Sequence, residues 1–403
     1  MFSKRVYLDY ASTTPVEWSV LKKMSRFFSV DFYNAQGLYD SAVKVKKVLE
    51  QARTDVARVC GVKDNEVIFT ASGTEGNNLA IIGAIKAFQK NNPNIVPKII
   101  TTEIEHVSVM EPIKFLEANG VGSVEAGLNK VEVVYLKTLL NGQIDIEEFK
   151  KVLDERVVLV SVMLANNEIG TLLPVRKISA EIKKFKNKIG RAHFDFPYLH
   201  SDASQSPCFL NINVNSIGID MMTLDGSKIY GPKGVGALIR KSYVSLENIL
   251  FGGNQEFGLR PGTENVPLVV GFAEALKLAE KNREADSARL IVLRDYFIEK
   301  LLQKFPQVKL NGDQENRLPN NVNICVPGLH AEFAVIKLSM LGVECSSVTA
   351  CKNISDETRS YVVDALGENC GTSSLRFTLG CPTKKGDIDF TLKVLEKVLT
   401  TTQ

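Results

Sequence analysis

Short apolar runs alternate with helical patterns over the first two thirds of the chain. The expected strands are residues 65–70, 97–102, 156–164, 199–204 and 220–226. Residues 75–90 and 144–155 show the apolar spacing of helices between such runs. Strands that alternate with helices are typical of a parallel sheet covered by crossover helices, so we expect an α/β domain here.

The pattern changes after about residue 264, where long helices and shorter alternating strands follow. Residues 320–326 and 373–379 are the clearest of these later strands. We expect a large α/β domain over residues 16–263 and a smaller α+β domain made of residues 1–15 and 264–403. The chain contains no internal repeat or low-complexity tract.

Polar residues follow several of the expected strands at their carboxyl ends. In order along the chain they are Ser72, Gly73, Thr74, His106, Asn167, Asp202, Gln205 and Lys228. In open α/β sheets, ligands bind outside the carboxyl ends of the strands. We therefore expect these side chains to meet in a single site.

The turn Ser72-Gly73-Thr74 predicts a phosphate site. It lies between a strand and the start of a helix, where backbone N–H groups and the helix dipole favour anions. A nucleotide-binding P-loop is absent, because Pro232 stands where that loop needs Lys-Ser or Lys-Thr. No GxGxxG motif follows the first strand, so a smaller phosphorylated cofactor is favoured over a dinucleotide.

Lys228 and Asp202 extend this interpretation. An exposed turn lysine is the ordinary explanation for Lys228, but a lysine at the end of a buried strand needs a partner or a chemical role. Pyridoxal phosphate needs a lysine that holds it covalently and an aspartate that keeps its ring nitrogen protonated. His106 could stack on such a ring, although a lone histidine near a strand end is more often structural.

Composition excludes several other classes of protein. The chain has 403 residues, 44% of them hydrophobic, and a net charge of +3, which allows two packed domains and gives no reason to expect nucleic acid. No stretch is long enough to span a bilayer. Seven cysteines without CxxC spacing argue against a structural zinc site or a disulfide framework, and favour a reducing, cytoplasmic compartment.

Together these segments resemble the NifS/IscS-like cysteine desulfurases, a family of fold-type I pyridoxal-phosphate enzymes in the class V aminotransferase superfamily. The resemblance covers essentially the whole chain and keeps the order of the motifs. The matching segments are YLDYASTTP (7–15), FTASGTEGNNLAI (69–81), TEIEHVSV (102–109), ANNEIG (165–170), SDASQS (201–206), DGSKIYGPKGVGAL (225–238), QEFGLRPGTENV (255–266), SSVTAC (346–351) and SSLRFTLG (373–380).

The resemblance implies a role for each matching residue. Lys228 would hold pyridoxal 5′-phosphate and act as a base, and His106 would stack on the ring. The cofactor contacts implied are Gly73, Thr74, His106, Asn167, Asp202, Gln205, Ser227, Lys228 and, from the second subunit of a homodimer, Thr263. No metal ligands are implied.

The implied substrate is L-cysteine. Arg376 would bind its carboxylate, assisted by Asn323 and Asn167. Cys351 would take the sulfur as a persulfide and leave alanine, with Cys345 the next candidate for this thiol. A sulfur-acceptor or scaffold protein, for iron–sulfur cluster assembly or another sulfur pathway, would be the partner.

The clearest departure from the family is Asp225-Gly226-Ser227, where members usually have Ser-Gly-His. We expect the Asp225 carboxylate either to turn away from the phosphate and cap the following turn, or to be neutralised by a lysine such as Lys233. Alternative functions are a selenocysteine lyase, a class V aminotransferase or, in a different class, a catalytically weak partner protein. Cys351 in a long loop favours the desulfurase.

Overall fold

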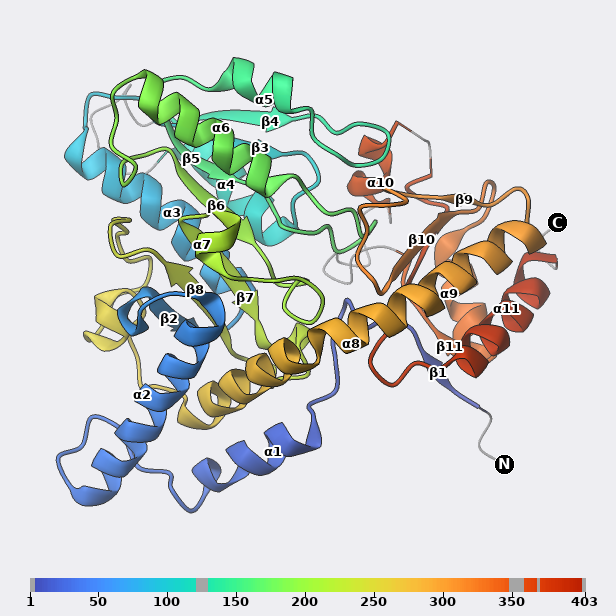
Figure 1. Ribbon diagram of the computed structural model, residues 1–403, viewed down its shortest axis with the longest axis horizontal. Coiled ribbons are helices and arrows are strands. Elements are labelled where there is room, and N and C mark those ends of the chain that lie inside the picture. The colour runs from blue at the N-terminus through green and yellow to red at the C-terminus, as the bar shows by residue number, and fades with distance from the viewer. Residues whose placement is uncertain (1–3, 121–129, 348–358, 368–369, 401–403) are drawn as a thin grey trace.

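A seven-stranded sheet forms the centre of the larger part of the molecule, shown in Figure 1 as a computed structural model that describes residues 4–120, 130–347, 359–367 and 370–400. In spatial order its strands are β2 (Val67–Thr70), β8 (Gly236–Arg240), β7 (Met221–Asp225), β6 (Tyr198–Asp202), β5 (Val157–Ser161), β3 (Lys98–Thr102) and β4 (Glu132–Leu136). The five strands expected from the apolar runs are all present here.

Strand direction decides where the site lies. β8 is antiparallel to both of its neighbours, and the remaining neighbours are parallel. Six strands therefore end at the same edge, which collects the residues after Thr70, Thr102, Ser161, Asp202 and Asp225. The predicted α/β architecture with a mostly parallel sheet is confirmed.

Helices cover both faces of this sheet. Those of the larger part are α1 (Trp18–Ser25), α2 (Asp40–Cys60), α3 (Gly73–Asn91), α4 (Val107–Asn119), α5 (Ile146–Val152), α6 (Val175–Lys188) and α7 (Val214–Ile217). Alternate residues of β2 face opposite cores: Ile68 packs with α3 and α4, whereas Val67 and Phe69 pack with α2. This two-sided burial explains why the strands read as nearly continuous apolar runs.

A smaller antiparallel sheet lies to one side, in the order β12 (Ser374–Thr378), β10 (Asn321–Cys325), β9 (Lys309–Leu310). Beside it β1 (Val6–Tyr7) pairs in parallel with β11 (Val343–Glu344). The helices here are α9 (Ala331–Met340) and α11 (Lys385–Thr400). The short helix α10 (Tyr361–Ala365) instead buries Val362 and Val363 in the core of the larger sheet. Val6 and Leu8 are buried in this second core, so the N-terminal strand lies among C-terminal elements, as Figure 1 shows.

The long helix α8 (Val266–Lys304) joins the two parts. Its first half, from Val266 to Ala279, is buried in the core of the larger sheet. Its second half, from Leu290 to Leu301, is buried in the core of the smaller one. A division of the chain at residues 263 and 264 stays a prediction, but this helix shows how the two cores are connected.

The cysteines differ from expectation in one respect. Cys325 of β10 and Cys370, which lies 45 residues later, form a disulfide with their Cα atoms 5.7 Å apart. This single pair is not a disulfide framework, but sequence reasoning did not predict it, because the two cysteines are far apart in sequence and meet only beside β10. Distant pairing of this kind leaves no spacing signal in the sequence.

Within the described residues no helix is long and apolar enough to cross a membrane. The same residues include no group of three or more His, Cys, Asp and Glu side chains placed to hold a metal ion.

Candidate active site

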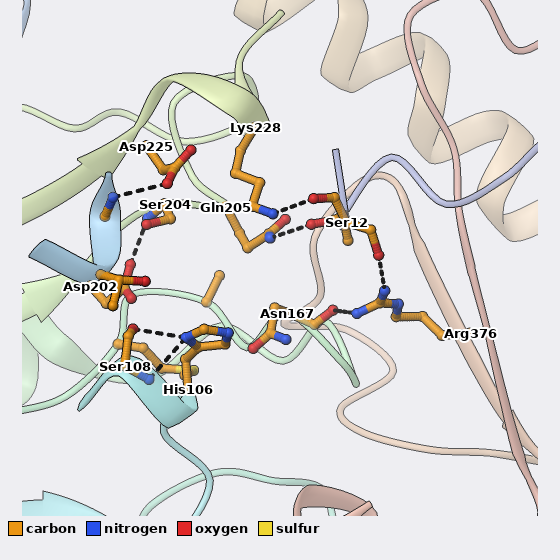
Figure 2. Close-up of a pocket in the computed structure, with 15 residues that line it drawn as sticks. Ser12, His106, Ser108, Asn167, Asp202, Ser204, Gln205, Asp225, Lys228 and Arg376 are labelled. Atoms are coloured by element: carbon orange, nitrogen blue, oxygen red, sulfur yellow. Dashed lines mark hydrogen bonds between the residues drawn. The ribbon is translucent and has the colours of Figure 1, made fainter. Parts of the chain in front are cut away.

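A cavity of about 780 Å³, counting its open mouth, lies at the carboxyl edge of the large sheet. Figure 2 shows that strand ends, the N-terminal segment and β12 all contribute to it. Its lining residues are Ala11, Ser12, Gly73, Thr74, His106, Ser108, Met163, Ala165, Asn167, Asp202, Ser204, Gln205, Asp225, Lys228 and Arg376. Eight residues predicted for the site are among them: Gly73, Thr74, His106, Asn167, Asp202, Gln205, Lys228 and Arg376.

Lys228 ends a short 3₁₀ turn, Gly226–Lys228, directly after β7. Its Nζ donates a hydrogen bond to the backbone oxygen of Ser12 in the N-terminal segment. That segment is itself fixed on the lysine turn, because Thr14 N donates to the backbone oxygen of Ser227 over 2.9 Å. The amine therefore lies in the cavity in a defined position.

Asp202 is buried at the end of β6, and its carboxylate accepts two hydrogen bonds from neutral donors. Ser204 N donates to Oδ1 over 2.9 Å and Asn77 Nδ2 donates to Oδ2 over 2.8 Å. Asn77 is fully buried on α3 and also donates to Ser108 Oγ at 2.8 Å. These contacts fix the orientation of the carboxylate, and sequence reasoning missed the role of Asn77.

His106 is the N-cap of α4. Its Nδ1 accepts a hydrogen bond from Ser108 N over 3.2 Å and lies 2.8 Å from Ser108 Oγ. Burial lowers the pKa of the imidazole, while the Asp202 carboxylate acts in the opposite direction. Because Nδ1 accepts from a backbone N–H, the neutral ring carries its proton on Nε2. The site thus presents a neutral, flat ring.

Arg376 extends into the cavity from β12 of the small sheet and is only 3% exposed. Its Nη2 lies 2.9 Å from Asp9 Oδ1 and 2.8 Å from Ser12 Oγ. Nη1 donates to the backbone oxygen of Asn167 over 3.1 Å. The guanidinium therefore ties the N-terminal segment, the small sheet and the loop after β5 together, and sequence reasoning missed the roles of Asp9 and Ser12.

The loop that carries Asn167 is shaped by its neighbour. Asn166 is fully buried, and its Oδ1 accepts hydrogen bonds from Glu168 N at 2.8 Å and Ile169 N at 2.9 Å. Gln205, on the opposite side of the cavity, donates through Nε2 to the backbone oxygen of Ala11 at 3.0 Å. Asn166 is thus a structural residue, whereas Asn167 lines the cavity.

Asp225 lies in the turn where a phosphate was expected. Gly73 N, at the first position of α3, donates to Asp225 Oδ2 over 2.9 Å. The other oxygen, Oδ1, accepts from Ser227 N at 2.8 Å and from Ser227 Oγ at 2.6 Å. The expected capping of the following turn is confirmed, but the expectation that Asp225 turns away from the phosphate turn is wrong.

Neutralisation of Asp225 by Lys233 is not observed either. Lys233 Nζ donates to the backbone oxygen of Thr14 at 3.1 Å. Lys233 contacts the N-terminal segment because this segment packs over the turn Gly226–Lys228. The sequence pattern did not predict that packing. Ser227 hydrogen-bonds to Asp225 and does not line the cavity.

Three further predicted residues lie elsewhere. Asn323 is buried on β10 opposite Arg376, where it donates to the backbone oxygen of Glu168 at 3.0 Å and does not line the cavity. Thr263 is exposed and outside the cavity of this single chain. Cys351 lies outside the described residues.

The alternative thiol, Cys345, is buried near Arg376 in the core of the smaller sheet. Burial raises the pKa of this thiol far above its usual value. A thiol that stays protonated is a poor nucleophile, so the environment of Cys345 does not favour it as the sulfur acceptor.

Comparison with known proteins shows first the general class and then the family to which the chain belongs. Residues 6–390 match the family model described as aminotransferase class-V. A curated relative, a cysteine desulfurase IscS of Dictyoglomus turgidum, is 36% identical over 98% of this chain and 95% of its own length. The chain therefore belongs to the class V aminotransferases and, within them, to the cysteine desulfurase family.

Solved structures agree. A NifS-like protein superposes with a TM-score of 0.86 at 29% identity and covers 98% of this chain and 100% of that one. A structure described as SspA in complex with cysteine has a TM-score of 0.74 at 29% identity, with 93% and 98% of the two chains covered. The predicted fold-type I pyridoxal-phosphate enzyme fold is confirmed.

The cavity fits pyridoxal phosphate at its ring end. Lys228, Asp202 and neutral His106 are the amine, carboxylate and flat ring that the cofactor needs. At the phosphate end, a Cβ on Gly73 would lie 3.1 Å from Ser204 Oγ and 3.3 Å from Asp225 Oδ2, so glycine avoids two tight contacts there. The carboxylate of Asp225 is the one group in this turn that a phosphate does not favour.

Proposed function

We propose that this chain is a cysteine desulfurase that converts L-cysteine to L-alanine and transfers the sulfur to Cys351. The observation that carries the proposal is the convergence of Lys228, Asp202, His106 and Arg376, from four separate elements, on one cavity. A single strand-end lysine has many explanations. An amine, a fixed carboxylate, a neutral imidazole and a guanidinium together suit an amino-acid substrate on pyridoxal phosphate.

Bound pyridoxal phosphate supplies an electron sink that weakens bonds at the α-carbon of an amino acid. In this proposal Lys228 holds the cofactor through Nζ and then moves a proton at the substrate. Asp202, held by Asn77 and Ser204, supports the positive ring nitrogen. His106 would stack on the ring, and Asn167 and Gln205 would flank it.

Arg376 would bind the substrate carboxylate. Guanidinium suits that task because its donors form a planar fork. Asp9 and Ser12 already hold Nη2, whereas Nε is buried without a hydrogen-bond partner among the described residues. We propose that the carboxylate takes donors from this guanidinium, with the ion pair to Asp9 keeping it oriented.

Sulfur transfer would use the thiolate of Cys351. The thiolate forms an S–S bond to the substrate sulfur while the C–S bond breaks, and the carbon side is protonated to alanine. The persulfide then passes to a sulfur-acceptor or scaffold protein. The relatives of this chain that are named cysteine desulfurase support the desulfurase activity on which this step depends.

Absorbance spectroscopy with product analysis tests the proposal. The purified protein with pyridoxal phosphate should show the visible band of a lysine-bound cofactor, and with L-cysteine and a thiol reductant it should form equal amounts of alanine and sulfide. Lys228→Ala should lose the band and the turnover while keeping its circular dichroism spectrum. A Lys228→Ala protein that retains both would refute the assignment.

Cys351→Ser distinguishes the desulfurase from its rivals on the same fold. It should retain the visible band but lose sulfide release and the persulfide that mass spectrometry detects. Undiminished turnover would instead favour a lyase or an aminotransferase, which needs no thiol. A protein with no band at any cofactor concentration would favour the catalytically weak partner, the alternative that Asp225 in the phosphate turn supports.

A further inference from the structure

The amide that opens α3 already has an anionic partner, and that partner is part of the chain. Gly73 N donates to Asp225 Oδ2 over 2.9 Å, and the 19 residues of α3 extend behind it. Helix N-termini attract anions through their N–H groups and the helix dipole. A cofactor phosphate that uses this turn must therefore share it with a carboxylate.

Asp225 is held too firmly to leave the turn without loss. Its Oδ1 accepts two hydrogen bonds from Ser227, at 2.8 Å from N and 2.6 Å from Oγ. Its backbone ends β7 and pairs with Gly236 of β8. A Cβ on Gly236 would lie 2.7 Å from the backbone of Ser72, so β8 and the start of α3 are in close contact, which fixes the carboxylate relative to Gly73.

The charges around Asp225 come from every element packed on the cavity. Lys228 follows on the same turn, His106 lies on α4, Asp202 ends β6 and Arg376 lies on β12. Among the described residues, Asp225 forms no ion pair: Arg376 is paired with Asp9, and Lys228 donates to Ser12.

Whether a phosphate can bind beside Asp225 depends on which cations offset the charge of the carboxylate. Glu75, in the first turn of α3, pairs with Arg260 at 3.0 Å, and Lys233 donates to Thr14. Neither cation is directed at Asp225. The described residues place no cation on the carboxylate and give it no easy route to leave, so a proton is the remaining means by which they can relieve its repulsion with a phosphate.

We infer that Asp225 makes phosphate binding proton-linked. The phosphate of pyridoxal phosphate shares one proton with the Asp225 carboxylate, and this proton is taken from solvent while no covalent bond changes. The inference rests on the proposed function, because it presupposes this cofactor. A phosphate monoester has a second pKa of about 6, so above that pH binding takes up one proton and weakens by about tenfold per pH unit.

Asp225→Asn is the direct test. Asparagine keeps an oxygen for Ser227 and offers the phosphate a donor in place of a carboxylate. The measurement is the dissociation constant of pyridoxal phosphate, from the visible band, between pH 7 and pH 9. The ratio of the wild-type to the variant constant should rise by about tenfold per pH unit, and taking the ratio cancels any pH dependence that both proteins share.

Phosphorus NMR of the bound cofactor gives a readout that is independent of activity. The wild-type protein should show a phosphate that stays protonated above pH 7, and Asp225→Asn should show the dianion. Pyridoxal, which lacks the phosphate, is the matched ligand control and should bind both proteins with the same pH dependence. Asp225→Ser repeats the test if asparagine perturbs the fold in circular dichroism.

The outcomes separate this inference from the proposed function. Visible bands in both proteins with identical pH dependence, or a dianionic phosphate in the wild type, would overturn the proton-sharing role and leave the cofactor assignment intact. No band in either protein at any pH would overturn the proposed function, and this inference with it.

Discussion

At the scale of single residues, the site is built from polar groups whose neighbours fix them. Asp202 and Lys228 were predictable because they end apolar strands on one side of a parallel sheet. Asn77, Ser108, Asp9 and Ser12 were not, because they act through contacts between segments far apart in sequence. Their types are ordinary, and only the folded chain shows which of them face the cavity.

Arg376→Lys should raise the KM for L-cysteine much more than it lowers kcat. A lysine cannot contact Asp9, Ser12 and the Asn167 backbone at once, and a lost charged hydrogen bond costs about 1.5–3 kcal/mol, which corresponds to about 10- to 100-fold. Steady-state kinetics measure this. Arg289→Lys is the matched control, because Arg289 binds two backbone oxygens near the end of β12, outside the cavity, and its KM should not change.

Glu105→Gln should flatten the dependence of stability on pH. Glu105 is fully buried, accepts from Thr102 Oγ1 and Met163 N at 2.9 Å each, and has no hydrogen-bond partner for Oε2 among the described residues. Burial raises its pKa to about 8 from a usual 4.5. The protonated acid is therefore favoured in the folded state, and its contribution to stability is present below pH 4.5 and is lost as the pH rises through 8.

Urea unfolding at pH 5 and pH 8 measures this effect. The wild-type protein should lose free energy of unfolding between the two values, and the loss should be smaller in Glu105→Gln, which cannot ionise. Each protein is compared with itself at the two pH values, so any pH-independent change in the free energy of unfolding caused by the amide cancels. An equal loss in both proteins would show that Glu105 does not titrate in this range.

At the scale of elements, the apolar pattern predicted five of the seven strands of the large sheet, because both faces of these strands are buried. What it could not predict is how turns pack on one another. Asp225 and Gly73 are 152 positions apart, and they meet only because β7 and β2 both lie beside β8. The Cys325–Cys370 pair and the path of the N-terminal segment over the lysine turn escaped prediction for the same reason.

The loop after β5 gives a test at this scale. Asn166→Ala should lower the free energy of unfolding by about 2–3 kcal/mol, since it leaves two backbone N–H groups of a buried loop without their acceptor. Asn167→Ala, one residue along, is the control: its side chain forms no hydrogen bond within the described residues, so stability should change by less than about 1 kcal/mol. Denaturant unfolding of both variants compares the two positions directly.

Unlike stability, catalytic activity should depend directly on Asn167. Asn167 lines the cavity, so Asn167→Ala should reduce kcat/KM for L-cysteine in a protein of nearly normal stability. If Asn167→Ala destabilises the fold as much as Asn166→Ala, the division of roles between these two asparagines is incorrect.

At the scale of the whole molecule, large apolar side chains are exposed on the part that contains α1 and α2. Leu38 is 97% exposed and Trp18 79%, while Phe251, in the segment before the loop predicted to cross to a partner subunit, is 83% exposed. The two regions are joined, since Gln36 hydrogen-bonds to Glu264. A large exposed apolar patch favours association, and we propose that a second copy of this chain covers it and places Thr263 near the partner's cavity.

Leu38→Asp tests this dimer. A charge in a buried apolar interface is costly, so the variant should run as a monomer in analytical ultracentrifugation where the wild-type protein runs as a dimer. Met340→Asp is the matched control, because Met340 is 81% exposed but lies on α9, far from α1 and α2 (Figure 1); it should remain a dimer. Because Thr263 is predicted to hold the phosphate across the interface, the Leu38→Asp monomer should also bind pyridoxal phosphate more weakly. A monomeric wild type that binds pyridoxal phosphate normally would show that each chain completes its own site. A Leu38→Asp variant that remains a dimer would show that Leu38 lies outside the interface.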